Sequence, residues 1–117
     1  MGEIFVVVEH RQDRIREIAF QMLWKGADLC EAGAHILNAV VIGGGEELPE
    51  EIRDRADRVI AVQGEDLATF DGEIYAGVLT DLLAEYRPLL TLMGHTPWGM
   101  DFAPALAVKT GLPLVTD

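Results

Sequence analysis

The apolar positions of the chain fall into short continuous runs that are separated by longer stretches with helical spacing. Continuous β-branched runs, rather than alternating ones, are typical of strands that are covered on both faces. These runs predict strands at Glu3–Val8, Ile36–Ile42, Arg58–Val62, Pro88–Gly94 and Leu112–Val115.

The stretches between these runs predict helices. The stretch Ile15–Cys30 carries one apolar stripe at three- and four-residue spacing, and Gly33 is suited to end that helix. Pro49 favours the start of a short helix, because its missing N–H costs nothing in the first turn. A second amphipathic helix is expected over about Asp71–Tyr86, and a last one over Trp98–Lys109.

Strands and helices that alternate with short connections predict an α/β fold, with one parallel sheet and helices on both of its faces. Right-handed crossovers leave few topologies, and we expect a Rossmann-like five-stranded sheet with strand order 3-2-1-4-5. In that order the switch point lies between the first and fourth strands. The length of 117 residues fits a single domain, 1–117.

The net charge of −11 narrows the possible partners. A surface this acidic repels nucleic acid and anionic lipid, so we expect neither as a partner. No apolar run reaches the roughly 20 residues of a membrane span, and the first strand starts too close to Met1 to leave room for a signal peptide. The single cysteine, Cys30, fits a small core residue in a protein of the reducing cytoplasm.

Ligands of such sheets bind outside the carboxyl ends of the strands, at the switch point. Here that crevice would be lined by the residues that follow the first strand and by the turn that follows the fourth. The candidate binding residues are Glu9, His10, Gly94, His95, Thr96 and Gly99.

The turn after the fourth strand has the G-x-x-x-x-G spacing of a phosphate-binding loop, with Gly94 and Gly99 at its ends. Met100 stands where such a loop needs its lysine, and Asp101 where it needs a serine or threonine, which excludes a P-loop nucleotide hydrolase. The run Gly43–Gly45 follows the second strand, away from the switch point and its candidate residues. It lacks the order of a dinucleotide fingerprint, and we interpret it as a flexible turn.

The sequence contains no recognisable catalytic set. There is no nucleophile elbow and no pair of carboxylates in an obvious cleft, and the three histidines are too scattered to indicate a metal site. We therefore predict no catalytic residue and no metal ligand. A small hydrolase that uses His10 and His95 remains open as an interpretation.

Three segments resemble a known family. The runs Thr96–Ala107 and Thr110–Asp117, together with the opening Ile4–His10, are similar to the amino-terminal domain of the electron transfer flavoprotein alpha subunit. The chain departs from the family pattern at two positions. The family usually has arginine at the position of Met100, and often has another at the position of Ala105. Those departures remove positive charge beside the predicted crevice.

The resemblance implies an electron carrier subunit without catalysis of its own. Members form a heterodimer with a beta subunit and carry electrons from flavin dehydrogenases to a quinone reductase. Their FAD lies mainly in a carboxyl-terminal domain that this chain does not contain, so no tightly bound cofactor is expected here. The resemblance implies a scaffold domain, and because the family's sheet continues beyond Asp117, we expect the isolated chain to self-associate.

A different class of function also fits the pattern. A stand-alone adenine-nucleotide-binding protein, of the universal stress or nucleotide hydrolase-like kind, would have the same adenine-nucleotide hydrolase-like fold. That function needs a glycine loop followed by serine or threonine, and the pair Met100–Asp101 argues against it.

Overall fold

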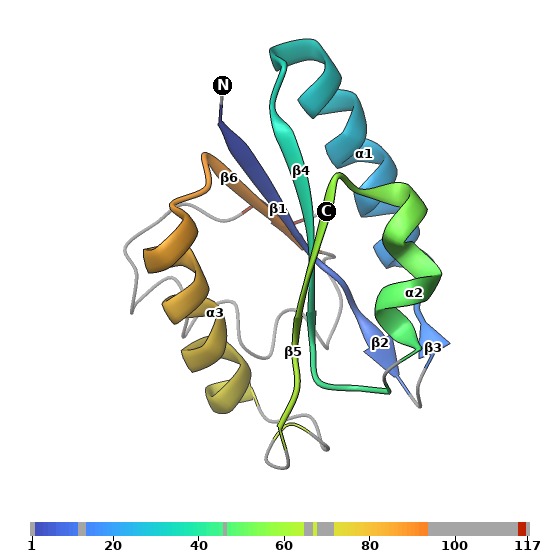
Figure 1. Cartoon of the computed structure of the whole chain (residues 1–117), viewed down its shortest axis with the longest axis vertical. Coiled ribbons are helices and arrows are strands. Elements are labelled where there is room, and N and C mark those ends of the chain that lie inside the picture. Colours follow the sequence, from blue (N-terminus) through green and yellow to red (C-terminus); the bar gives the residue numbers. More distant parts are fainter. Residues whose placement is uncertain are drawn as a thin grey trace.

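The centre of the molecule is a parallel sheet of five strands (Figure 1). The computed structural model describes residues 2–11, 14–45, 47–64, 67, 72–93 and 115–116. The strands of the sheet are β1 (Glu3–Val7), β4 (Ile36–Ile42), β5 (Arg58–Val62), β6 (Leu90–Met93) and β7 (Val115–Thr116). They are arranged in the order β5-β4-β1-β6-β7. When these five strands are counted along the chain, this is the predicted order.

Helices cover both faces of the sheet, as predicted (Figure 1). One face carries α1 (Glu17–Gly33), α2 (Leu48–Ile52) and the short 3-10 helix η1 (Arg53–Arg55), and the other carries α3 (Gly72–Tyr86). The sheet is therefore the middle layer of three.

The core consists of two apolar layers, because successive residues of a strand point to opposite faces. Ile4, Val6 and Val8 pack with α1 and α2, whereas Phe5 and Val7 pack with α3. Burial on both faces explains why the first and second strands are continuous apolar runs rather than alternating ones.

Helix α1 packs closely on the sheet at Gly26. A Cβ atom at that position would lie 2.8 Å from Leu37 Cδ1 and 3.0 Å from Val6 Cγ2, so the absence of a side chain sets the distance between the layers. The helix ends at Gly33, as predicted. The next residue, Ala34, caps it with a left-handed φ of 55°, and its N–H bonds to the Cys30 carbonyl.

A small antiparallel hairpin precedes α1 and was not predicted. Strand β2 (His10–Arg11) pairs with β3 (Arg14–Ile15), with His10 opposite Ile15. The prediction that Ile15 opens the first helix is wrong. Ile15 still packs against the core from the strand, so its apolar side chain fits either pattern.

The predicted boundaries hold closely elsewhere in the described part of the chain. The second and third strands have the predicted bounds, whereas β6 begins at Leu90 rather than at Pro88. The helix predicted over Trp98–Lys109 lies outside the described residues. Within the described ranges no helix is long and apolar enough to cross a bilayer.

Candidate functional site

The first two candidate residues, Glu9 and His10, lie at the carboxyl end of β1 and are buried. Only 5% of Glu9 and 8% of His10 is exposed. The ring of His10 reaches the end of β4, where its Nε2 lies 2.8 Å from the Ile42 carbonyl oxygen. Since a carbonyl can only accept, Nε2 carries the hydrogen and donates it. His10 thus ties the end of β1 to the end of β4.

Glu9 is held by the return of the chain after the hairpin. Its carboxylate lies 3.7 Å from Arg16 Nε, and its backbone carbonyl accepts a hydrogen bond from the Arg16 N–H at 3.0 Å. A buried carboxylate is costly unless a cation and hydrogen-bond donors compensate it. Arg16 supplies both the opposite charge and the backbone bond, so Glu9 acts here as the anchor of the hairpin base.

The glycine turn after β4 packs against His10. Gly43 and Gly44 have φ of 73° and 79°, which favours glycine, and the Gly43 N–H bonds to the Val62 carbonyl at 2.8 Å. A Cβ atom on Gly44 would lie 3.1 Å from Cε1 of the His10 ring and would also overlap Leu48. The predicted turn is present, and its glycines are needed for both conformation and space.

The opposite side of the same turn is closed by Tyr75 of α3. A Cβ atom on Gly43 would lie 2.8 Å from the Tyr75 hydroxyl oxygen and would overlap the Leu67 carbonyl. Tyr75 is almost fully buried, and burial raises the pKa of its hydroxyl. The end of β4 therefore lies between His10 on one face of the sheet and Tyr75 on the other.

The remaining candidates cannot be placed against this arrangement. Gly94, His95, Thr96 and Gly99 lie outside the described residues, so their joint role with Glu9 and His10 stays a prediction. What the structure does show is that His10 turns toward Ile42 and Gly44. Sequence reasoning missed this contact because it assigned the glycine turn a place away from the candidate residues.

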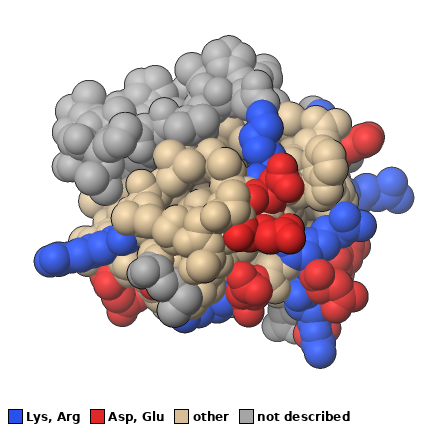
Figure 2. All heavy atoms as spheres, turned by 90° about the horizontal axis from the view of Figure 1, so that it is seen from above, with Lys and Arg blue, Asp and Glu red and all other residues tan. Residues whose placement is uncertain are grey.

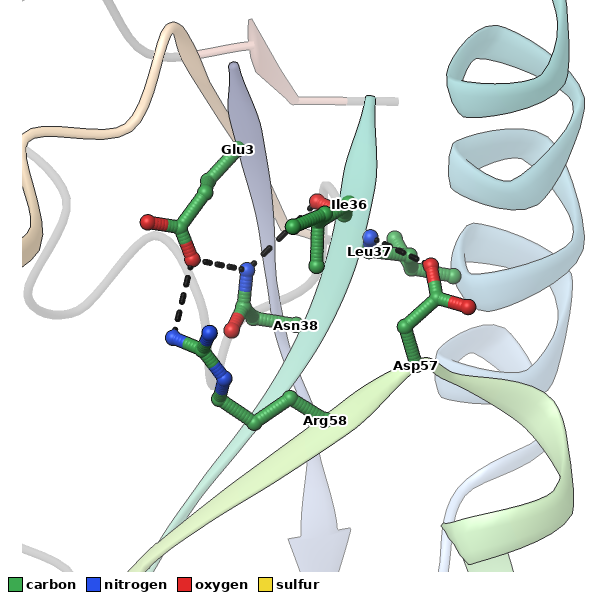
Figure 3. A network of polar contacts seen from close by, with 6 residues as sticks. All are labelled: Glu3, Ile36, Leu37, Asn38, Asp57 and Arg58. Atoms are coloured by element: carbon green, nitrogen blue, oxygen red, sulfur yellow. Dashed lines mark hydrogen bonds and ion pairs between the residues drawn. The ribbon is translucent and has the colours of Figure 1, made fainter. Parts of the chain in front are cut away.

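The amino-terminal edge of the sheet carries a polar network (Figure 3). Glu3 Oε1 accepts hydrogen bonds from Asn38 Nδ2 at 3.1 Å and from Arg58 Nη1 at 3.0 Å. Asp57 Oδ2 accepts the Leu37 N–H at 2.9 Å. These bonds join β1, β4 and the start of β5. Asn38 is fully buried, and its Oδ1 has no hydrogen-bond partner among the described residues.

Cys30 lies beside that edge, in a hollow of about 450 Å³ between α1 and η1. Burial, and secondarily the Asp57 carboxylate, raise the pKa of its thiol. A thiol that resists ionisation is a poor nucleophile, which agrees with its predicted role as a core residue. No group of three or more metal-ligating side chains occurs among the described residues.

Among the described residues, one large aromatic side chain is exposed, and the sequence did not indicate it. Trp24 of α1 is 79% exposed, and it borders a hollow of about 500 Å³ together with Ile18 and Met22. Its only signal in the sequence is an aromatic residue between the apolar positions of the helical stripe. Figure 2 shows acidic and basic side chains interspersed over the amino-terminal end of the molecule.

The sequence has clear relatives. Residues 4–117 match the family model described as "Electron transfer flavoprotein domain". The chain is 34% identical to the electron transfer flavoprotein subunit alpha of Syntrophomonas wolfei, over 100% of this chain and 36% of that protein. It is 30% identical to the subunit alpha of Clostridium acetobutylicum, over 97% of this chain and 34% of that protein.

A third relative carries the name of an enzyme subunit. The LctC subunit of lactate dehydrogenase (NAD(+),ferredoxin) from Acetobacterium woodii is 28% identical over 97% of this chain and 28% of its own length. Among solved structures, a universal stress protein from Archaeoglobus fulgidus has a TM-score of 0.58 and 16% identity, and the match covers 99% of this chain and 93% of that one. That likeness shows the fold alone.

The chain spans about a third of the length of the curated relatives that it matches. The family match, in contrast, covers nearly all of this chain. The chain therefore belongs to the electron transfer flavoprotein family and is similar to the alpha subunits of that family.

Proposed function

We propose that this chain is the amino-terminal scaffold domain of an electron transfer flavoprotein alpha subunit. The observation that carries the proposal is the family match over residues 4–117, with alpha subunits as relatives. In this role the chain packs against a beta subunit in a cytoplasmic heterodimer. The complex takes electrons from flavin dehydrogenases and passes them to a quinone reductase, and this domain supplies no catalytic group.

The packing at the carboxyl end of β4 supports a scaffold role. In a ligand-binding member of this fold class, backbone N–H groups after the strands stay open to the ligand. Here the Gly43–Gly44 turn is enclosed by His10, Leu48 and Tyr75. Side chains of the chain itself therefore fill the space around this turn.

The described residues do not fit the phosphates of FAD. The side chains around Gly44 prevent close approach of a pyrophosphate to the turn after β4. We propose that the FAD of the complex is held mainly by other parts of it, and that this chain binds none tightly. Isolated from its partners, the chain self-associates.

We assign the contact with the beta subunit to the outer face of α1 around Trp24. Tryptophan is enriched among the residues that dominate binding energy, and large exposed apolar groups are typical of interfaces. Trp24 is the most exposed large apolar residue in the described part of the chain. Lys25 and Asp28 border it and would form the polar rim.

A binding titration tests this proposal. The chain is titrated against an electron transfer flavoprotein beta subunit, and the variant Trp24→Ala is compared with Leu89→Ala. Leu89 is 62% exposed and lies between α3 and β6. The control variant Leu89→Ala therefore also removes exposed apolar surface, but away from α1. We expect Trp24→Ala to weaken binding by at least about tenfold and Leu89→Ala to leave it unchanged. Absence of binding by the unaltered chain would refute the scaffold role.

The second candidate is a stand-alone adenine-nucleotide-binding protein. It is compatible with the fold, which a universal stress protein shares, but the pair Met100–Asp101 argues against it. A protein of this second kind would keep a bound nucleotide through purification. The two candidate functions therefore predict different masses for the purified protein.

A further inference from the structure

The residue that precedes β1 is held by two neighbouring residues at the start of β4. The Gly2 N–H donates a hydrogen bond to His35 Nδ1 at 3.0 Å, and the Gly2 carbonyl accepts the Ile36 N–H at 2.9 Å. A Cβ atom on Gly2 would overlap the side chain of Leu89, so that side chain packs on Gly2. The two hydrogen bonds therefore fix the start of β1 beside the start of β4.

The first of these bonds defines the protonation state of His35. A backbone N–H can only donate, so Nδ1 of the ring carries no hydrogen and is the acceptor. The ring is then neutral, with its hydrogen on Nε2. A second proton would bind at Nδ1 and would occupy the lone pair that accepts the Gly2 N–H. The bond to Gly2 and a charged ring therefore exclude each other.

The His35 ring lies beside the end of α1, in space that a glycine leaves open. A Cβ atom on Gly33 would lie 2.5 Å from Nε2 and 2.6 Å from Cδ2 of the ring. His35 is half-buried, and it lines the hollow of about 450 Å³ between α1 and η1. His35 therefore contacts Gly2 and also borders this hollow.

The charges around the hollow favour a protonated ring. Three carboxylates line it, those of Glu31, Asp54 and Asp57, and within the described ranges none of them forms an ion pair. The carboxyl end of α1 adds partial negative charge, because its last turn contains no basic residue. Arg55 also lines the hollow and opposes this effect, but its guanidinium lies 4.6 Å from the centre of the Phe20 ring.

Two further ionisable groups lie next to His35 or Gly2. The Cys30 thiol lines the same hollow, and burial raises its pKa, so it stays uncharged near neutral pH. Glu3 follows Gly2, but its carboxylate accepts hydrogen bonds from Asn38 and Arg58. The carboxylates of the hollow are therefore the groups available to a charged His35 ring.

We propose that His35 is a pH-sensitive latch on the start of β1. The neutral ring accepts the Gly2 N–H and keeps the latch closed. The protonated ring releases this N–H and turns its two N–H donors toward the carboxylates of the hollow, so that only the bond from Ile36 still holds Gly2. Histidine changes its charge between about pH 5 and 8, so the latch opens as the pH falls through this range. The proposal concerns the chain itself and does not depend on the proposed function.

The test compares the unaltered chain with His35→Asn by NMR at about pH 8 and about pH 5. The asparagine Oδ1 can take the place of Nδ1 and accept the same N–H, but it does not titrate. In the unaltered chain we expect the Gly2 amide to exchange about 2–10-fold faster at the lower pH, relative to an unstructured chain at the same pH. In His35→Asn this relative rate should be the same at both pH values. An unchanged relative rate in the unaltered chain, or an equal increase in both proteins, would overturn the proposal.

A second measurement covers the case in which the asparagine variant does not fold. In the unaltered chain, the nitrogen shifts of the His35 ring report which nitrogen carries hydrogen, and a coupling across the hydrogen bond joins Gly2 N to Nδ1. We expect hydrogen on Nε2 alone and a measurable coupling at about pH 8, and a ring protonated on both nitrogens without the coupling at about pH 5. Hydrogen on Nδ1 at the higher pH, or a Gly2 amide signal that does not respond when the ring is protonated, would overturn the proposal.

Discussion

Replacement of His10 tests the hydrogen bond that ties the end of β1 to the end of β4. Replacing it by leucine removes the donor to the Ile42 carbonyl, which is 2.8 Å away in a buried position. A buried acceptor that loses its partner costs about 1–3 kcal/mol. Leucine restores some apolar contact, so we expect His10→Leu to lower the free energy of unfolding by about 2 kcal/mol.

The matched control is His10→Gln. The amide nitrogen of glutamine can reach the place of Nε2 and donate to the same carbonyl, so this variant should lose less than about 1 kcal/mol. Urea unfolding monitored by circular dichroism measures both. With a slope of about 1–2 kcal/mol per molar urea, the leucine variant should unfold at a midpoint about 1 M or more lower. The reasoning fails if the leucine variant is as stable as the unaltered chain, or if glutamine destabilises as much as leucine.

Four further predictions concern the helices and the buried side chains. Gly77→Ala should stabilise the chain by about 1 kcal/mol, because no described atom lies within 4 Å of the added Cβ. Gly26→Leu should destabilise it by about 1–3 kcal/mol, because Leu37 occupies the space. The urea midpoints of the two variants test both predictions. Burial raises the pKa of the Tyr75 hydroxyl in the folded state. The contribution of Tyr75 to the free energy of unfolding is therefore complete below about pH 10 and is lost as the pH rises further. At pH 11 the variant Tyr75→Phe should lose less stability than the unaltered chain. Cys30 should react with a thiol reagent at pH 8 at least about tenfold more slowly in the folded chain than in urea, and equal rates would contradict its burial.

The sequence predicted the sheet because its strands are covered on both faces. Ile36–Ile42 is apolar except at Asn38, and Arg58–Val62 is apolar after its first residue. No helical spacing competes with that pattern. The short hairpin escaped prediction for a physical reason. Its strands have two residues each, which is too short for a period, and Ile15 continues the apolar stripe of the helix behind it.

The candidate site was predicted only in part. The sequence identified Glu9 and His10 as residues at the end of a strand, and the structure places them there. Their partners depend on tertiary packing: His10 bonds to a carbonyl 32 residues away, and its ring fills the space beside Gly44. Neither a contact over that separation nor the left-handed backbone of the glycine turn can be read from spacing alone.

A native mass spectrum of the purified chain, recorded before and after incubation with AMP, ATP and FAD, tests the central claim most directly. That claim is that the chain is a scaffold domain that holds no nucleotide of its own. We predict the mass of the polypeptide alone, as monomer and dimer, with every added nucleotide lost on buffer exchange. One AMP, ATP or FAD retained per chain would contradict the claim and favour the nucleotide-binding alternative.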